Sequence, residues 1–143
     1  MLVTVGMAIV KYNSDDYEGD KVSDEYLQSL YDDENAYLDF YSTHYYNWQS
    51  AWFSTPIGKT PEEFKLHTDK PCMIAETHND DAGDIGMSLA DKYKDLCDHG
   101  WSGILVWSQT DGSEESWYRY DLTKEATNAM YEYAPEKIRP LDD

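Results

Sequence analysis

The segment Pro71-Cys72-Met73-Ile74-Ala75-Glu76 joins a short apolar run to a carboxylate. A run of this length between polar residues predicts a buried β-strand. The polar segment 77–81 follows, so Glu76 stands where the predicted strand opens into a loop. Parallel α/β proteins carry their reactive side chains at such strand ends. No Lys or Arg follows before Lys92 to pair with a purely structural carboxylate, so Glu76 is the leading catalytic candidate.

Side-chain alternation along this strand predicts that Cys72, Ile74 and Glu76 share one face, and we expect that face to point inward. Cys97 falls in a segment with helical periodicity, which would pack outside the sheet. The two cysteines could pair in principle. Their predicted positions instead favour two buried free thiols.

Three further apolar runs have strand character, and each of the four runs precedes a helical pattern. They begin on the order of 30 residues apart, the length of one βα unit. The predicted strands are 2–6, 38–44, 71–76 and 103–107, and the predicted helices begin at Ser23, Thr60, Asp84 and Asp121. The second helix is predicted from Thr60-Pro61-Glu62-Glu63, which has the pattern of a capping box.

This alternation predicts an α/β fold with a parallel sheet and helices outside it. An open doubly wound domain and half of a barrel both fit. No G-x-G-x-x-G turn follows a strand, whereas His44, Glu76 and Trp107 end successive strands and would meet at one edge. The sequence therefore favours half of a TIM (β/α)8 barrel, with residues 1–143 as one partial domain, because a complete barrel needs about 250 residues.

The composition limits the kinds of partner that the chain could bind. The formal charge is −18, from 29 acidic and 11 basic residues, so the chain would repel nucleic acid and anionic membranes. Five Trp and 13 Tyr, many of them among polar residues, suit a flat polar ligand such as a sugar. No apolar stretch is long enough for a membrane span, and 1–5 lacks signal-peptide character, so the compartment is not predicted.

No cofactor or metal is predicted. The acidic segment 79–84 does not have the spacing of a calcium-binding loop, and the four histidines lack ligand spacing.

The segment His44-Tyr45-Tyr46-Asn47-Trp48 follows the second predicted strand. His44 and Tyr46 are two residues apart and would face the same way, so both could address a ligand or orient a carboxylate. A surface aromatic cluster explains the segment equally well. Trp107 either floors a sugar site or belongs to the core.

At these residues the chain resembles the C-terminal half of a retaining glycoside hydrolase of the cellulase and mannanase superfamily, which includes glycoside hydrolase family 5 in clan A. In that family the sixth strand ends in H-x-Y, matched by His44-Tyr45-Tyr46. The seventh ends in a nucleophilic Glu, matched by Glu76, and the eighth in a Trp, matched by Trp107. The resemblance implies strands 5 to 8 of the barrel with their helices.

The resemblance also implies roles. Glu76 would be the nucleophile, Tyr46 would orient it, His44 would contact substrate and Trp107 would stack on the sugar. Position in the strand-end loops adds further candidate substrate-binding residues, which are Trp48, Trp52, His78, Asn79 and Gln109. The substrate would be a plant β-polysaccharide such as mannan or glucan, and full-length relatives are often secreted.

The family takes its acid/base from an Asn-Glu motif on the fourth strand, and this sequence has no Asn-Glu dipeptide. Glu114 or Glu115 could replace it only through an unusual geometry. We therefore expect an inactive fragment, a truncated product, or a half that needs the missing N-terminal half-barrel. The alternative is a non-catalytic carbohydrate-binding half-barrel, or one that associates with itself through open edges near Leu2 and Gly103.

Overall fold

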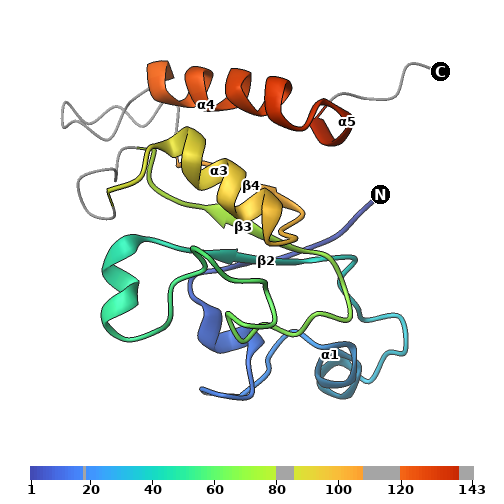
Figure 1. The fold of residues 1–143 in the computed structure, drawn as a ribbon. Helices are drawn as coiled ribbons and strands as arrows, with labels where there is room; N and C mark the ends of the chain where they lie inside the picture. The colour runs from blue at the N-terminus through green and yellow to red at the C-terminus, as the bar shows by residue number, and fades with distance from the viewer. Residues whose placement is uncertain (18, 80–85, 108–119, 139–143) are drawn as a thin grey trace.

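The computed structural model describes residues 1–17, 19–79, 86–107 and 120–138. Its centre is a parallel sheet of four strands in the order β1-β2-β3-β4, which is also their order in the chain (Figure 1). The strands are β1 (Gly6–Met7), β2 (Tyr41–His44), β3 (Cys72–Glu76) and β4 (Gly103–Ile104). The sheet and its helices have the architecture of half a TIM barrel, as the sequence predicted. The four strands lie within the predicted runs or overlap them, but the two edge strands are shorter than predicted.

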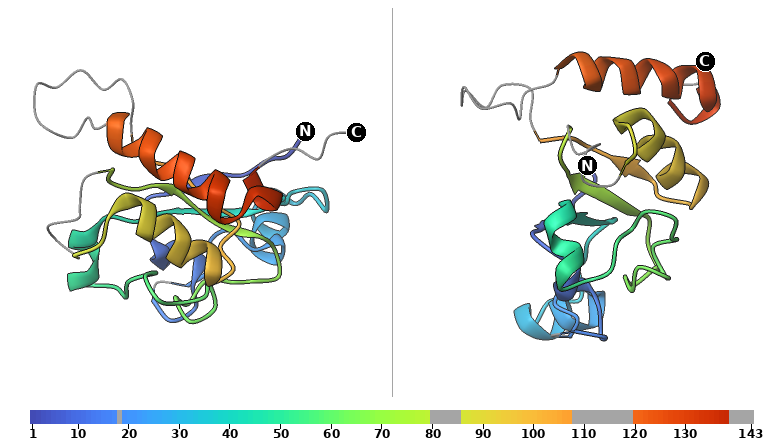
Figure 2. Two further views of the ribbon diagram at one scale, coloured as in Figure 1. Left: turned by 45° about the horizontal axis from the view of Figure 1, so that its top comes forward. Right: turned by 60° about the vertical axis from the view of Figure 1, so that its left-hand side comes forward.

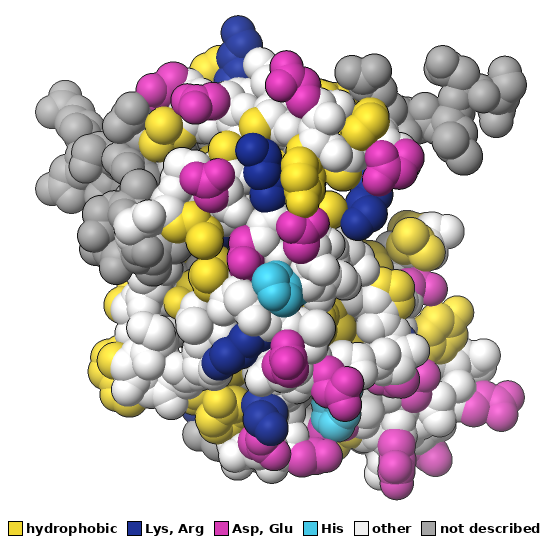
Figure 3. Space-filling view, in the orientation of Figure 1, with side chains coloured by type: hydrophobic (Ala, Val, Ile, Leu, Met, Phe, Trp, Pro, Cys, Tyr) yellow, Lys and Arg dark blue, Asp and Glu magenta, His cyan; other side chains and the backbone are white. Residues whose placement is uncertain are grey.

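Helices and short 3₁₀ segments connect the strands. They are η1 (Val10–Asn13), α1 (Asp24–Tyr31), η2 (Asn47–Ala51), α3 (Leu89–Asp98), α4 (Tyr120–Tyr133) and α5 (Pro135–Ile138). Figure 2 shows α3 and α4 side by side next to β3 and β4, with α1 at the opposite end of the molecule. Figure 3 shows acidic side chains spread over the viewed face, as the composition implies.

Side-chain caps set where the helices begin. Ser23 accepts a hydrogen bond from the Tyr26 N–H, and α1 begins directly after it, as predicted. Ser88 caps α3 in the same way through the Asp91 N–H, so α3 begins at Leu89. The predicted start at Asp84 lies outside the described residues. The predicted end of α3 is confirmed, since Gly100 follows it with a φ of +81°.

The helix predicted at Thr60 does not form, although its capping box does. The Thr60 N–H donates to Glu63 Oε2 (2.9 Å), and the Glu63 N–H donates to Thr60 Oγ1 (3.2 Å). The chain then makes one turn and reverses at Lys65, whose φ is +76°. This reversal lets both Phe64 and Leu66 enter the core, so tertiary burial overrides the local helix signal.

The face prediction for β3 is wrong for Cys72 and Ile74. Both belong to the core cluster that includes Leu96 of α3, so they face the helical layer. Both cysteines are free, as predicted. Cys72 is buried, and burial raises the pKa of its thiol to about 12. Cys97 is partly exposed rather than buried.

Candidate active site

The site is built on the ends of the two central strands. β2 and β3 pair Tyr41 with Cys72 and Thr43 with Ile74, but His44 pairs with Glu76. One extra residue on β3, Ala75, therefore sits opposite this step, as in a β-bulge. Strict alternation from Ile74 does not extend across this irregularity, so Glu76 is aligned with the last residue of β2.

Both carboxylate oxygens of Glu76 have neighbours from the β2 end. The Tyr46 hydroxyl donates a hydrogen bond to Glu76 Oε1. Glu76 Oε2 lies 3.4 Å from Nδ1 of His44. The side chains of His44 and Glu76 are 23% and 21% exposed, so the cluster is half-buried but open to a ligand.

The environment of Tyr46 fixes its role as a donor. Burial, followed by the hydrogen bond to Glu76 and the charge of that carboxylate, raises the pKa of Tyr46 above its usual value. The phenol therefore stays protonated at neutral pH and holds one carboxylate oxygen in place. Such a contact orients the carboxylate.

Tyr45 anchors the segment that carries His44 and Tyr46. Its side chain is buried, its hydroxyl donates to Thr55 Oγ1 (3.0 Å), and its ring meets that of Phe64 edge to face. Its backbone N–H donates to the Glu76 carbonyl (2.9 Å). No motif marks Tyr45 as a functional residue, although alternation from His44 places it on the core-facing side.

Aromatic rings continue outward from Tyr46. The ring of Tyr46 stacks on Trp48 at 6.5 Å with 13° between the planes, and Trp48 meets Trp52 at 5.9 Å. His78 also contacts the ring of Tyr46, edge to face, with 4.6 Å between the ring centroids. Trp48 and Trp52 are 58% and 69% exposed, so these two large rings leave much of their surface open to solvent.

Trp107 also reaches this end of the sheet. Its backbone N–H donates to the Thr77 carbonyl (2.9 Å), and it is 53% exposed, which argues against the plain core alternative. Asn79 is buried, and its role in substrate binding stays a prediction. Gln109, Glu114 and Glu115 lie outside the described residues.

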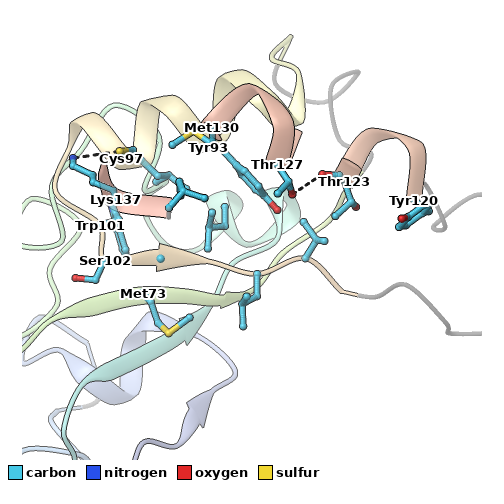
Figure 4. Close-up of a pocket in the computed structure, with 16 residues that line it drawn as sticks. Met73, Tyr93, Cys97, Trp101, Ser102, Tyr120, Thr123, Thr127, Met130 and Lys137 are labelled. Atoms are coloured by element: carbon cyan, nitrogen blue, oxygen red, sulfur yellow. Dashed lines mark hydrogen bonds between the residues drawn. The ribbon is translucent and has the colours of Figure 1, made fainter. Parts of the chain in front are cut away.

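The structure also has an apolar cavity of about 600 Å³, drawn in Figure 4. It lies between β4, α3 and the α4–α5 segment, and Met73, Leu96, Leu105 and Met130 line it. None of the predicted site residues that the structure describes lines this cavity, so it is separate from the Glu76 cluster.

Among the described residues, no group of His, Cys, Asp and Glu side chains has a metal-binding arrangement. Over the same part of the chain, no helix has the length and apolar character that a bilayer crossing needs.

Comparisons with known proteins agree on one group of enzymes, although no family model matches the chain. The chain is 30% identical over 114 residues to a mannan endo-1,4-β-mannosidase of Mytilus edulis, a match that covers 78% of this chain and 30% of that protein. The structure superimposes on a β-1,4-mannanase of the sea hare Aplysia kurodai with a TM-score of 0.75 and 27% identity, covering 97% of this chain and 37% of that one. A β-mannanase of the blue mussel Mytilus edulis gives a TM-score of 0.72 at 27% identity, covering 90% and 34%.

An endo-1,4-β-mannanase of Eisenia fetida shares the fold, with a TM-score of 0.72 at 23% identity. The chain thus spans about a third of the length of the relatives it matches. These matches confirm the resemblance to glycoside hydrolases of the cellulase and mannanase superfamily.

Proposed function

We propose that this chain, which resembles part of the β-mannanases, carries the nucleophile half of a retaining glycoside hydrolase that acts on β-mannan. The observation that carries the proposal is the Glu76 cluster at the ends of β2 and β3. There a carboxylate at a strand end is held by a neutral phenol and lies beside an imidazole.

In the proposed reaction, Glu76 attacks the anomeric carbon of a mannosyl unit, and the leaving sugar departs with a proton from a second carboxylic acid. Water then releases the sugar from the glycosyl-enzyme. Tyr46 orients Glu76 through its hydrogen bond to Oε1, and it is a positioning residue in this scheme. His44 and His78 flank the reacting sugar, and Trp107 stacks on it.

The exposed pair Trp48 and Trp52 extends the proposed sugar-binding surface away from Glu76. Aromatic faces beside hydrogen-bonding groups are suited to sugar rings. The β-mannanase relatives favour mannan over glucan as the substrate.

The second acid is proposed to come from a complementary half-barrel. Retaining hydrolysis needs it about 5 to 5.5 Å from the nucleophile. The family's Asn-Glu motif is absent from residues 1–143. β1 and β4 are the edges of the sheet, and Val3, Val5 and Leu105 beside them are exposed apolar residues that further strands would cover.

The test compares this chain alone with the same chain joined to the N-terminal part of the Mytilus β-mannanase that lies outside the match. We expect hydrolysis of β-mannan only by the joined protein. Glu76→Gln should lower it by at least about a thousandfold, because the amide cannot act as the nucleophile. Glu62→Gln, on an exposed turn, is the matched control and should leave the rate unchanged.

Binding of manno-oligosaccharides without hydrolysis by the folded joined protein would contradict the catalytic proposal. A Glu76→Gln variant that keeps its activity would contradict the role of Glu76.

A further inference from the structure

We infer that Gly6 is a positioning residue for His44, because only glycine at this place on β1 leaves room for the imidazole beside Glu76. The geometric part of this inference stands on the structure, and its catalytic consequence rests on the function proposed above.

The imidazole of His44 spans the ends of three strands. Gly6 of β1 pairs with Ser42 of β2, two residues before His44. A Cβ atom built on Gly6 would lie only 2.9 Å from His44 Nε2. The other ring nitrogen, Nδ1, lies 3.4 Å from Glu76 Oε2 on β3. The ring is thus confined between the bare backbone of β1 and the carboxylate of β3.

Space, and not backbone conformation, is the reason for glycine here. Among the glycines that the structure describes, those with positive φ are at 19, 58, 86 and 100, and Gly6 is not one of them. Alanine therefore fits the backbone of β1 without strain. The methyl group would meet the tip of a side chain rather than backbone atoms, so we expect the ring to move while the strand stays in place.

Displacement of this ring would change the surroundings of Glu76. His44 Nδ1 would leave Oε2, and among the described residues Tyr46 alone would still bind a carboxylate oxygen of Glu76. A one-carbon change on an edge strand would therefore reach the nucleophile across the width of β2.

Gly103 offers a matched control. It is also a strand glycine, on β4, but a Cβ atom there would lie 3.6 Å from Cε of Met73, which is an ordinary contact. Gly103→Ala should therefore disturb neither its neighbour nor His44.

The first readout is the imidazole nitrogen and proton resonances of His44 in this chain, assigned with His44→Ala. Gly6→Ala should shift them in the same direction as Glu76→Gln does, and Gly103→Ala should leave them in place. Unchanged His44 resonances in Gly6→Ala would overturn the inference.

Stability gives a second readout. If Gly6→Ala lowers the melting temperature, the added substitution His44→Ala should restore it, because it removes the obstructing ring. Failure of the double variant to recover would show that the methyl group clashes with something else, and the inference would be wrong.

Activity gives the third readout, in the joined protein. Gly6→Ala should lower kcat/KM on the order of tenfold, and it should have no further effect once His44 is Ala. An equal loss in both backgrounds would overturn the positioning role. If Glu76→Gln keeps full activity, the proposed function fails, but the resonance test of Gly6 still stands.

Discussion

The centre and the β4 edge of the sheet differ in how completely they are packed. At the centre, β2 and β3 each have a partner strand on both sides. The side chains of Cys72 and Ile74, on the face of β3 toward the helical layer, are fully buried. At the edge, β4 has one partner strand, Leu105 is exposed, and a cavity of about 600 Å³ lies between β4, α3 and the α4–α5 segment. The Glu76 cluster stands on the well-packed centre, which explains how half a barrel can hold these side chains in place.

The largest expected difference between the centre and the edge is in the reactivity of the two cysteines. Cys72 is buried at the centre with its pKa raised to about 12, while Cys97 lines the cavity at the edge. Because burial shields Cys72 from the reagent and raises the pKa of its thiol, iodoacetamide at pH 8 should modify Cys97 faster than Cys72, on the order of a hundredfold. Peptide mass spectrometry over time measures both rates. Equal rates would mean that the centre opens as readily as the edge.

Truncation of one buried side chain in each region is the next test. Ile74→Ala should lower the free energy of unfolding by about 4 kcal/mol, because Ile74 has no exposed surface and its neighbours cannot collapse into the space. Met130→Ala should cost only about 2 kcal/mol, because Met130 already borders a cavity. Urea unfolding followed by circular dichroism gives both values. A larger cost for Met130→Ala would reverse the comparison.

Removing one hydroxyl group from each region tests whether the centre of the sheet alone contributes to catalysis. Tyr46→Phe removes the donor to Glu76 and should lower kcat on β-mannan in the joined protein by about 10- to 100-fold. Tyr120→Phe, at the cavity, should leave kcat unchanged. Because the pKa of Tyr46 is raised, its phenol stays protonated beyond pH 10, so it should add no alkaline limb to the wild-type rate profile below that pH. An equal loss of kcat in both variants would contradict the view that the centre of the sheet alone contributes to catalysis.

The turn that replaced the predicted helix gives the smallest effect. Thr60→Ala removes the cap of the Glu63 N–H, and it should cost about 0.5 to 1 kcal/mol of stability. Phe64 and Leu66 hold the turn by burial, so it should persist. Thermal unfolding checks the size of the loss, and a cost above about 2 kcal/mol would mean that the capping box, rather than burial, maintains this segment.

The sequence predicted the parallel sheet because apolar runs and helical patterns recur at βα spacing, and the residues at the strand ends favoured half a barrel over an open doubly wound domain. It also predicted that His44 and Glu76 end neighbouring strands, and the register pairs them. It could not predict the extra residue opposite Thr43 and His44, since a bulge depends on how two strands meet. For the same reason it assigned Cys72 and Ile74 to the wrong face.

The reversal at Lys65 and the space above Gly6 were also beyond sequence reasoning. Each depends on residues distant in the chain: Phe64 and Leu66 need a core to enter, and Gly6 matters only because His44 lies over it. The capping box at Thr60 formed as its local sequence predicts. Burial of Phe64 and Leu66 nevertheless made this segment a turn and not a helix.

The most direct test of the account is to trap the proposed glycosyl-enzyme. The joined protein is treated with a 2-deoxy-2-fluoro mannosyl fluoride, whose ring fluorine slows release of the sugar from a retaining nucleophile, and its peptides are mapped by mass spectrometry. The account predicts one fluoromannosyl adduct on Glu76 and none in Glu76→Gln. An adduct on another carboxylate, or steady hydrolysis of β-mannan with no adduct at all, would contradict it.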